Sequence, residues 1–398
     1  MRRGMTRALC AVTVVAALGL VTAPAGAKQA PPATIYVTVC GNTSQCTSGK
    51  VITFDTATNT IGEKIPAAGV GGPIAITPNG ATAYVVSRQS GGSVVPISTA
   101  TNTAGPAIPL GFVATVIAIT PDGKTVYAVN FEKASVTPID TATGTAGPPI
   151  TGVGVFADEI VITPDGKTAY VATGGDPATV TPINVATNTA GPAITVDKFV
   201  GDIVITPDSK TAYVATTDRF GTFNTVIPLN TATNTKGRAI PLSKEPGQMA
   251  ITPNGATLYV TLRKAKGSVV PISTATNTVG TPISAGIKPS LIAISPDGTK
   301  AYVVSETHNT FKKIYSTSLR SITIAIGAVS KQIIVKRSSE PNYVTAMVFT
   351  PSSKTLYALG FTRITGSPGY LVAVDTATNK ASPHFPVGRY PGGMAITP

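Results

Sequence analysis

Short apolar runs alternate with polar turns along nearly the whole chain. Ile160–Ile162 is one such run, and the turn Thr163–Gly166, with sequence Thr-Pro-Asp-Gly, follows it. The next segment, Thr168–Ala172, places a tyrosine among small and β-branched residues. An unbroken apolar run is typical of a strand buried on both faces, and Pro, Asp and Gly favour a tight turn. The unit therefore predicts two antiparallel strands joined by a turn.

This unit recurs through the sequence. The proline of each Thr/Ser-Pro turn marks one copy, and a tyrosine follows that proline by six residues in all but the last copy. The commonest interval between copies is 43 residues, and the longest is 55. Such a period, with four strand-length segments in each unit, is typical of a propeller blade. The marker prolines are Pro78, Pro121, Pro164, Pro207, Pro253, Pro296, Pro351 and Pro398.

The second half of each unit supplies the two outer strands. Val180–Ile183 is the third strand, and Gly191–Ile194 begins the fourth, where Pro192 suits a sheet edge. No segment has the apolar spacing of a helix, so we predict an all-β fold. A proline also recurs inside the third strand, where it requires either a bulge or a missing N–H that faces no partner. Its copies are Pro96, Pro138, Pro182, Pro228 and Pro271.

The phrasing of the repeats resembles the YVTN β-propeller repeat family, whose second strand carries Tyr-Val-Thr-Asn. Here the corresponding tetrapeptides begin at Tyr36, Tyr84, Tyr127 and Tyr170, and none is the full motif. The flanking Thr-Pro-Asp-Gly and Asp-Thr-Ala-Thr-Asn-Thr phrases carry the resemblance, which covers residues 34–398. It implies an exported or surface propeller, often without an assigned activity, and it brings no catalytic residues.

The two ends of the chain complement each other. Thr34–Val39 contains a tyrosine strand with no turn ahead of it, and Met394–Pro398 contains an inner strand and turn with no tyrosine after them. We expect the termini to pair in one blade, with three outer strands from the N-terminus and the inner one from the C-terminus. This gives eight blades. Seven is the alternative if the long basic unit at 308–345, where Tyr315–Ser318 stands in place of the Asp-Thr-Ala-Thr turn, forms no separate blade.

The N-terminal 27 residues have the pattern of an export signal. Three arginines precede the apolar run Cys10–Thr22, which is too short to span a membrane, and Ala25–Ala27 offers a cleavage site. An uncleaved anchor is the alternative. We expect residues 28–33 to form a short linker and residues 34–398 a single propeller domain. The mature protein is then secreted or at the cell surface, with no membrane span.

Cys40 and Cys46 are the two cysteines left after cleavage. In an exported protein such a pair predicts a disulfide that closes a hairpin loop. A metal site is the alternative, but two thiols without neighbouring ligands are half a set.

Charge divides unevenly along the mature chain. Residues 28–200 hold 8 Lys+Arg against 10 Asp+Glu, whereas residues 201–398 hold 20 against 8. A basic half suits an anionic partner such as nucleic acid, a cell-wall polymer or lipid headgroups. Solubility and non-specific adhesion are the plainer interpretation.

One face of the predicted ring carries turns that repeat almost verbatim, and the other carries loops that differ from unit to unit. Differences within one chain do not come from the shared fold, so the variable face is the predicted ligand face. Its candidate residues are Phe112, Phe156, Asp158, Glu159, Phe199, Asp202, Lys288, His308, Arg389 and Tyr390.

Three of these candidates are carboxylates from adjacent units. Asp158, Glu159 and Asp202 are predicted to converge near the ring axis, where oxygen ligands would suit Ca²⁺; solvated rim carboxylates are the alternative. The three phenylalanines either stack on a sugar or peptide or close the centre of the ring.

Several chemistries are excluded by the residues present. His308 and His384 are the only histidines, so a His-rich copper or zinc centre is ruled out. The sequence has no nucleophile elbow, phosphate loop or haem attachment site. We assign no catalytic residue, no metal ligand and no cofactor apart from the possible Ca²⁺.

The leading hypothesis is a secreted, monomeric, non-enzymatic propeller that binds a cell-envelope polymer or protein. A lactonase or lyase type of enzyme, with acidic loops and His308 in one pocket, is the alternative. A binder of anionic polymers, either nucleic acid or cell-wall polymer, is the other.

Overall fold

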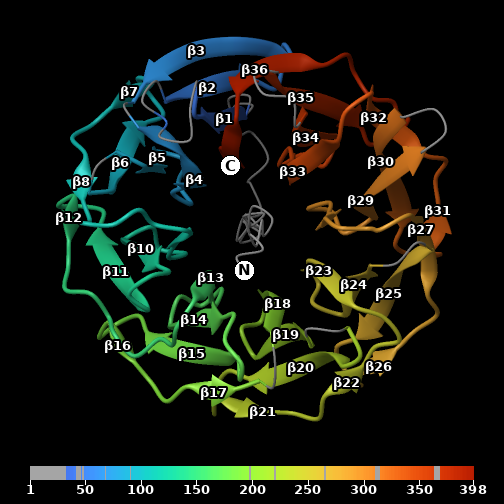
Figure 1. Ribbon diagram of the computed structural model, residues 1–398, viewed down its shortest axis with the longest axis horizontal. Helices are drawn as coiled ribbons and strands as arrows, with labels where there is room; N and C mark the ends of the chain where they lie inside the picture. Colours follow the sequence, from blue (N-terminus) through green and yellow to red (C-terminus); the bar gives the residue numbers. More distant parts are fainter. Residues whose placement is uncertain are drawn as a thin grey trace, which may run out of the picture.

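The computed structural model describes residues 33–41, 46, 49–67, 69–89, 91–196, 199–218, 221–263, 266–309, 314–362 and 368–398, without the side chains of 307–309 and 314. Thirty-seven strands in this part of the chain form eight antiparallel sheets around one axis (Figure 1). The predicted all-β propeller with eight blades is confirmed. The predicted export signal, residues 1–27, and the linker as far as residue 32 lie outside the described residues.

We number the blades along the chain, from blade 1, which contains the N-terminal strands, to blade 8. Each blade has four strands from the axis outward, and the outermost is split in most blades. The inner strands, from blade 1 to blade 8, are β37 (Pro391–Ile396), β4 (Val70–Ile76), β9 (Ile117–Ile119), β13 (Ala157–Ile162), β18 (Phe199–Ile205), β23 (Pro246–Ile251), β28 (Ile292–Ile294) and β33 (Asn342–Phe349). The second strands are β1 (Thr34–Val39), β5 (Thr82–Ser87), β10 (Thr125–Asn130), β14 (Thr168–Thr173), β19 (Thr211–Thr217), β24 (Thr257–Leu262), β29 (Lys300–Asn309) and β34 (Thr355–Thr362).

The third strands, in the same order, are β2 (Lys50–Asp55), β6 (Ser93–Ser98), β11 (Ser135–Asp140), β15 (Thr179–Asn184), β20 (Asn224–Asn230), β25 (Gly267–Ser273), β30 (Ile314–Thr323) and β35 (Pro368–Asp375). The outermost strands are β3 (Thr60–Pro66), β7 (Thr103–Ala104) with β8 (Ile108–Pro109), β12 (Thr145–Ala146), β16 (Thr189–Ala190) with β17 (Ile194–Thr195), β21 (Thr235–Lys236) with β22 (Ile240–Pro241), β26 (Thr278–Val279) with β27 (Ile283–Gly286), β31 (Ala328–Val329) with β32 (Ile333–Ser338), and β36 (Phe385–Arg389).

The two ends of the chain close the ring. Blade 1 has the order β3-β2-β1-β37, so its inner strand comes from the C-terminus and its other three from the N-terminus. Ile35 pairs with Ile396, and Val37 pairs with Met394. The predicted pairing of the termini in one blade is confirmed, and Figure 1 shows the red strand that ends at the mark C beside β1.

The irregular unit at 308–345 is a full blade. Its strands β29 and β30 have 10 residues each, and they pair with each other along their whole length. The placement of Tyr315–Ser318 at the turn was wrong, because these residues lie inside β30. The turn of this blade is Thr323–Gly327, between β30 and β31. The extra length therefore extends a hairpin and leaves the number of blades unchanged.

The third-strand prolines fit a continuous register. Tyr84 pairs directly with Pro96, and the ladder between β5 and β6 shows no shift. The Pro96 carbonyl accepts a 2.8 Å hydrogen bond from the N–H of Gly105, which directly follows β7. A strand residue directs its N–H and C=O to the same neighbour, so the nitrogen of Pro96 faces the break between β7 and β8. Of the two predicted explanations, a missing N–H that faces no partner is the correct one.

The core consists of eight apolar layers, one between each pair of neighbouring blades. In one layer, Tyr170 and Ala172 of blade 4 pack with Ile203 and Ala212 of blade 5. The central tyrosine of the second strand is almost completely buried in every blade. Because each layer belongs to two blades, no blade has a core of its own.

At six of the eight interfaces, the buried tyrosine of one blade forms a hydrogen bond with the next blade. The tyrosine hydroxyl donates to the Oδ1 atom of an asparagine in the turn between the third and fourth strands of the following blade. Each of these asparagines has a positive φ, from 52° to 56°, which Asn tolerates better than most residues. The six pairs are Tyr36–Asn102, Tyr127–Asn188, Tyr170–Asn234, Tyr213–Asn277, Tyr302–Asn379 and Tyr357–Asn59, at 2.6–2.9 Å.

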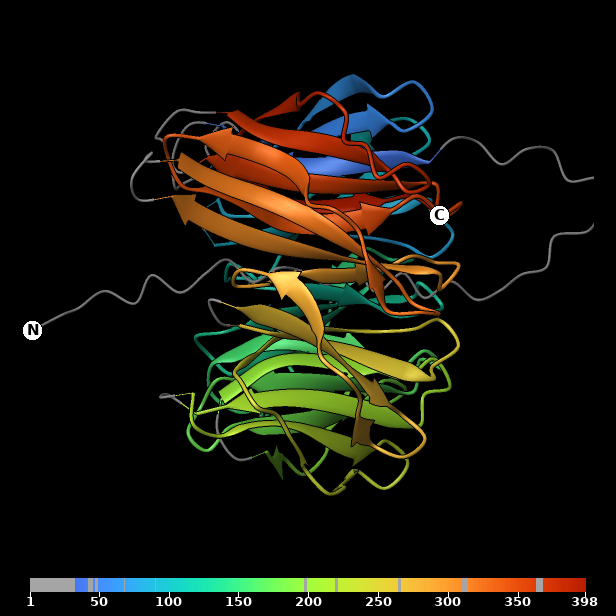
Figure 2. The same ribbon diagram turned by 90° about the vertical axis from the view of Figure 1, so that its right-hand side faces the viewer.

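The ring has two faces of different character. Figure 2 shows it edge-on, with the strands running between the faces. The turns after the first and third strands of each blade lie on one face, which we call the turn face. The loops after the second and fourth strands lie on the other, which we call the loop face. The predicted disulfide is confirmed, because Cys40 and Cys46 are bonded with an S–S distance of 1.99 Å. No helix suitable for crossing a bilayer occurs in the part of the chain that the structure describes.

Candidate functional site

One position in the inner strand distinguishes a sector of the ring. It lies five residues ahead of the marker proline, within the inner strand or directly before it. In blades 4, 5 and 6 this position is polar, and in the other five it holds Gly, Pro, Val, Leu or Ala. From blade 1 to blade 8 the residues are Gly393, Pro73, Val116, Glu159, Asp202, Gln248, Leu291 and Ala346. A contiguous polar patch therefore lies near the axis on the loop-face side.

Backbone bulges set the direction of these side chains. The register of β13 against β14 shifts between Ala157 and Glu159, and that of β18 against β19 shifts between Val200 and Asp202. A β-bulge bends the strand and re-aims the side chain that follows it. The two carboxyl groups of neighbouring blades thereby meet at the interface between β13 and β18.

Glu159 and Asp202 form a pair of carboxyl groups, of which Asp202 is buried and Glu159 is half-buried. Asp202 is 2% exposed, and its Oδ2 atom accepts a 2.5 Å hydrogen bond from Met249 N–H. Burial raises the pKa of Asp202 to about 6, against the lowering effect of its hydrogen bonds from Met249 and Glu159. Burial, and then the charge of Asp202, raise the pKa of Glu159 well above its ordinary value. The proton is therefore bonded to Glu159, whose carboxyl O–H donates a hydrogen bond to the Asp202 carboxylate.

Opposite charges continue from this pair across the next two blades. Arg263, which follows β24, lies 3.9 Å from Glu245, between their Nη1 and Oε1 atoms. Arg263 also lowers the pKa values of Asp202 and Glu306 through its charge. Burial raises the pKa of Glu306, while Lys288 and Arg263 lower it. The sector from blade 4 to blade 7 thus presents both acidic and basic groups.

The loop face also carries most of the exposed apolar side chains. Nine large apolar residues are exposed in the described part of the chain, and six of them lie in loops of this face. Phe223 is 69% exposed, and Phe156 is 52% exposed. The six are Val113, Val155, Phe156, Phe223, Ile287 and Tyr390. Apolar side chains gathered on one face mark an interaction surface more strongly than the same residues scattered.

A shared backbone conformation presents three of the predicted residues. Phe156, Lys288 and Tyr390 each lie eight residues ahead of a marker proline, and their φ angles are 59°, 46° and 51°. This left-handed region is unfavourable for residues with a large side chain. All three side chains are exposed. Phe156 is steadied by the ring of Phe131, at a centroid distance of 5.4 Å.

The remaining predicted residues lie in different surroundings. Phe112 packs against the apolar layer between blades 2 and 3, and Phe199 begins β18 in a half-buried position. Asp158 occupies the bulge next to Glu159, and Arg389 is exposed at the end of β36. His308 pairs with Tyr315 near the tip of the β29–β30 hairpin, and its side chain lies outside the described part.

The predicted Ca²⁺ site has no further support in the geometry. Among the described residues, no group of three or more His, Cys, Asp or Glu side chains is placed to hold a metal ion. Glu159 and Asp202 share a proton and a hydrogen bond, which occupies the oxygens that a cation would need. Ca²⁺ binding therefore stays a prediction.

Four exposed apolar residues of the loop face were absent from the predicted set: Val113, Val155, Phe223 and Ile287. Phe223 lies in the loop between β19 and β20, and Val155 precedes Phe156. The interval from Pro207 to Pro253 exceeds the usual 43 residues by three, which marks an insertion in that unit. This insertion is the sequence signal for the longer loop that carries Phe223.

The fold and the loop-face site place the chain in the class of single-chain β-propellers. No protein-family model and no curated protein matches it. Among solved structures it is similar to the dihydro-heme d1 dehydrogenase NirN, with 15% identity over 94% of this chain and 78% of the other, at a TM-score of 0.71.

Two further structures show the same likeness. Hydrazine synthase from Kuenenia stuttgartiensis matches at 21% identity over 80% of this chain and 96% of the other, with a TM-score of 0.55. A candidate 6-phosphogluconolactonase from Bacteroides uniformis matches at 16% identity over 93% of this chain and 100% of the other, with a TM-score of 0.58. At these identities the likeness concerns the fold alone.

Proposed function

We propose that the protein is an exported binding module that captures a polymer or protein of the cell envelope through its loop face. The observation that carries this proposal is the gathering of six exposed large apolar side chains on that face. The same face carries acidic and basic groups in the sector from Glu159 to Glu306. Apolar anchors beside charged groups are the composition of a recognition surface.

Export is supported by two features of the chain. The N-terminal residues 1–27 have the pattern of an export signal, and the disulfide between Cys40 and Cys46 belongs to oxidising compartments. The repeat phrases support membership of the YVTN family, which resembles this chain along residues 34–398. Fractionation of cells that make the full-length protein tests the location, and recovery of the uncleaved protein in the cytoplasm would contradict it.

Site-specific crosslinking tests the binding face. A photoreactive phenylalanine analogue placed at Phe156 or Tyr390 should crosslink to one envelope component in intact cells. The same analogue at Thr187, an exposed position in a turn of the opposite face, is the matched control. Equal yields at Thr187 and Phe156, or no specific product from either loop-face position, would reject the proposal.

A lactonase or lyase activity is a second candidate, favoured by one observation. The Glu159–Asp202 pair has raised pKa values, as groups that exchange protons in catalysis often do. The fold likeness to a candidate 6-phosphogluconolactonase suggests a first substrate. Hydrolysis of 6-phosphogluconolactone should then fall at least tenfold in Asp202→Asn. A rate equal to the spontaneous one would eliminate this candidate.

Binding of an anionic polymer is the third candidate. It rests on the excess of 20 Lys+Arg over 8 Asp+Glu in residues 201–398. Retention on heparin should fall steeply between about 50 and 200 mM salt if several cations contact the polymer. Lys288→Glu with Arg389→Glu should reduce that retention. Unchanged retention in this double variant would show that the loop face does not bind the anionic polymer.

A further inference from the structure

The interface between blades 6 and 7 lacks the tyrosine–asparagine hydrogen bond. Tyr259 is 4% exposed, and its hydroxyl makes no hydrogen bond with another described residue. The position of the accepting asparagine is occupied by Gly327, with φ +64°. The interface between blades 2 and 3 also has a glycine, Gly144, at this position, but there burial raises the pKa of Tyr84 and the nearby Thr141 side chain lowers it.

The turn that carries Gly327 also differs in its other residues from the corresponding turns of the other blades. In blade 5 the corresponding residues are Thr231-Ala232-Thr233-Asn234, and in blade 7 they are Ile324-Ala325-Ile326-Gly327. Two threonines have become isoleucines, and Ile326 is 76% exposed, the highest value among the exposed large apolar residues. An exposed isoleucine contributes nothing to turn formation, so its presence indicates a contact outside the blade.

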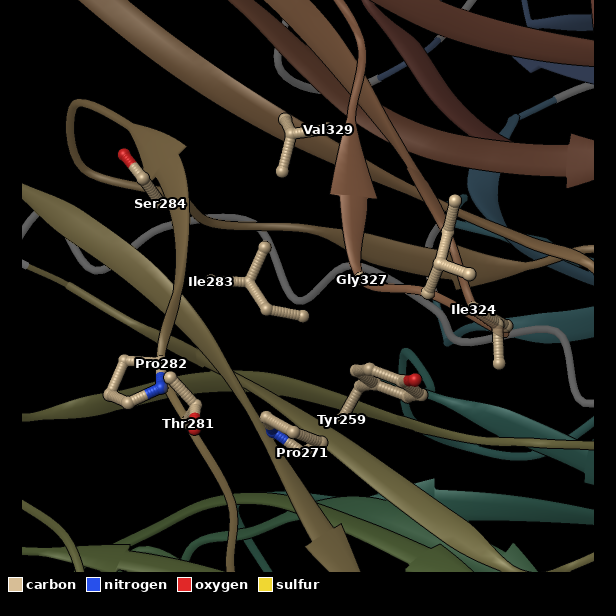
Figure 3. Close-up of a pocket in the computed structure, with 10 residues that line it drawn as sticks. Tyr259, Pro271, Thr281, Pro282, Ile283, Ser284, Ile324, Gly327 and Val329 are labelled. Atoms are coloured by element: carbon tan, nitrogen blue, oxygen red, sulfur yellow. The ribbon is translucent and has the colours of Figure 1, made fainter.

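A pocket of about 460 Å³ lies at this interface. Tyr259 and Pro271 of blade 6 lie on one side of it, and Ile324, Gly327 and Val329 of blade 7 lie on the opposite side (Figure 3). Its volume is in the range of small-ligand sites. Most of the side chains that line the pocket are apolar, and the Tyr259 hydroxyl is a hydrogen-bond donor in its wall.

We propose that this pocket binds a polypeptide segment that carries an asparagine between aliphatic residues. The carboxamide oxygen of that asparagine accepts a hydrogen bond from the Tyr259 hydroxyl. The aliphatic side chains cover Ile324, Ile326 and Val329. The partner thus supplies the contact that the chain's own asparagine supplies at six other interfaces.

The six internal pairs are the reason for choosing this occupant. Each shows the same buried tyrosine hydroxyl bonded to a carboxamide oxygen, so the preferred acceptor at Tyr259 is known from its counterparts. An acidic side chain is disfavoured, because a carboxylate in an apolar pocket without a cation bears a large desolvation cost. The replacement of the two threonines by isoleucines defines the apolar remainder of the ligand.

The space at Gly327 provides a direct test. A Cβ atom added there would meet only Ile283 Cδ1, at 3.8 Å, which is an ordinary contact. The φ of Gly327, 64°, is close to the 52–56° that the six asparagines adopt. Gly327→Asn should therefore place its own carboxamide on Tyr259 and exclude the ligand. The matched control is Gly144→Asn, because a Cβ atom there meets nothing within 4 Å, and it lies at the interface between blades 2 and 3.

Titration of the methyl-labelled protein with acetyl-Leu-Asn-Leu-amide, followed by NMR of the isoleucine methyl groups, measures the binding. We expect shifts of Ile324 and Ile326 with a Kd on the order of 1 mM, as a short flexible peptide loses much of its binding energy to ordering. The peptide with Ala in place of Asn, and the variant Tyr259→Phe, should each bind about fivefold more weakly. Gly327→Asn should show no shifts, and Gly144→Asn should behave as the wild type.

Three results would overturn the proposal. The first is the absence of shifts at Ile324 and Ile326 with about 10 mM peptide. The second is equal affinity for the Asn and Ala peptides. The third is unchanged binding in Gly327→Asn. If Gly327→Asn does not fold, Tyr259→Phe decides, because the loss of one hydroxyl leaves the ring in place.

Discussion

The hydroxyl of Tyr213 donates a 2.8 Å hydrogen bond to Oδ1 of Asn277, across the boundary between blades 5 and 6. Tyr213 belongs to a second strand and Asn277 to a turn 64 residues later. The same relationship recurs at six of the eight interfaces. Blades are therefore joined by a polar bond at the turn face as well as by the apolar layer beneath it.

Removal of this hydroxyl should destabilise the ring. In Tyr213→Phe the Asn277 carboxamide loses its donor, and we expect the free energy of unfolding to fall by about 1 kcal/mol. Denaturation followed by circular dichroism measures the change. Tyr259→Phe is the control, because its hydroxyl bonds to no other described residue, and its effect should be close to zero. Equal losses in the two variants would show that the hydrogen bond contributes nothing.

The Glu159–Asp202 pair should make the folded protein less stable as the pH rises. The pKa of Asp202 in the folded protein is about 6, against 3.8 as its ordinary value, so between these values the folded state binds more protons than the unfolded state. Stability then falls through this window, by on the order of 2–3 kcal/mol. The raised pKa of Glu159 extends the fall to higher pH.

The variant Glu159→Gln with Asp202→Asn isolates this contribution. It keeps hydrogen-bonding groups at both positions and removes both titrations. The difference in unfolding free energy between the wild type and this variant should therefore change in favour of the variant between about pH 4 and pH 6.5. A pH-independent difference would mean that the two carboxyl groups ionise as they do in water.

Phe156 should be replaceable at little cost to folding. Its φ of 59° is costly for a residue with a side chain and free for glycine. In Phe156→Gly, the relief of that strain offsets the loss of the Phe131 contact and the greater freedom of the unfolded chain. We expect the unfolding free energy to stay within about 1 kcal/mol of the wild type, whereas a buried phenylalanine truncated to alanine costs about 3–5 kcal/mol. A loss in that higher range would show that Phe156 supports the fold.

The disulfide should contribute about 2 kcal/mol, because it closes a short loop between β1 and β2. Cys40→Ser with Cys46→Ser should lower the unfolding free energy by that amount. The wild type in the presence of reductant should match the variant, and the variant itself should not respond to reductant. If the reductant also lowered the unfolding free energy of the variant, its effect would not come from this disulfide.

Much of the fold followed from the spacing of the repeats. Pro121, Pro164 and Pro207 recur at 43 residues, and a period of that length predicts a propeller blade. The closure of the ring followed from the half-units at the two ends. These features could be predicted because they depend only on local sequence patterns and on the number of residues between repeats. Neither depends on which side chains contact one another in the folded protein.

The site was only partly predictable. The proximity of Glu159 and Asp202 followed from their equal position in adjacent units, and alignment on the marker prolines also reveals Gln248. Their shared proton depends on burial, which sequence spacing does not report. The pocket at Tyr259 was missed because Tyr315–Ser318 was taken as the turn, so that the replacement of Asn by Gly327 was not apparent.

The pairing of Ile35 with Ile396 sets the order of events during biosynthesis. A ribosome makes Ile35 long before Ile396, so β1 emerges well ahead of its partner strand β37. Until β37 follows, the strand β1 has an open edge, and the string of blades has two free ends. A nascent chain can stack blades 2 to 8 one after another, but it becomes a ring only once β37 has emerged. A chain cut short before Pro391 therefore forms an open arc in place of a closed ring.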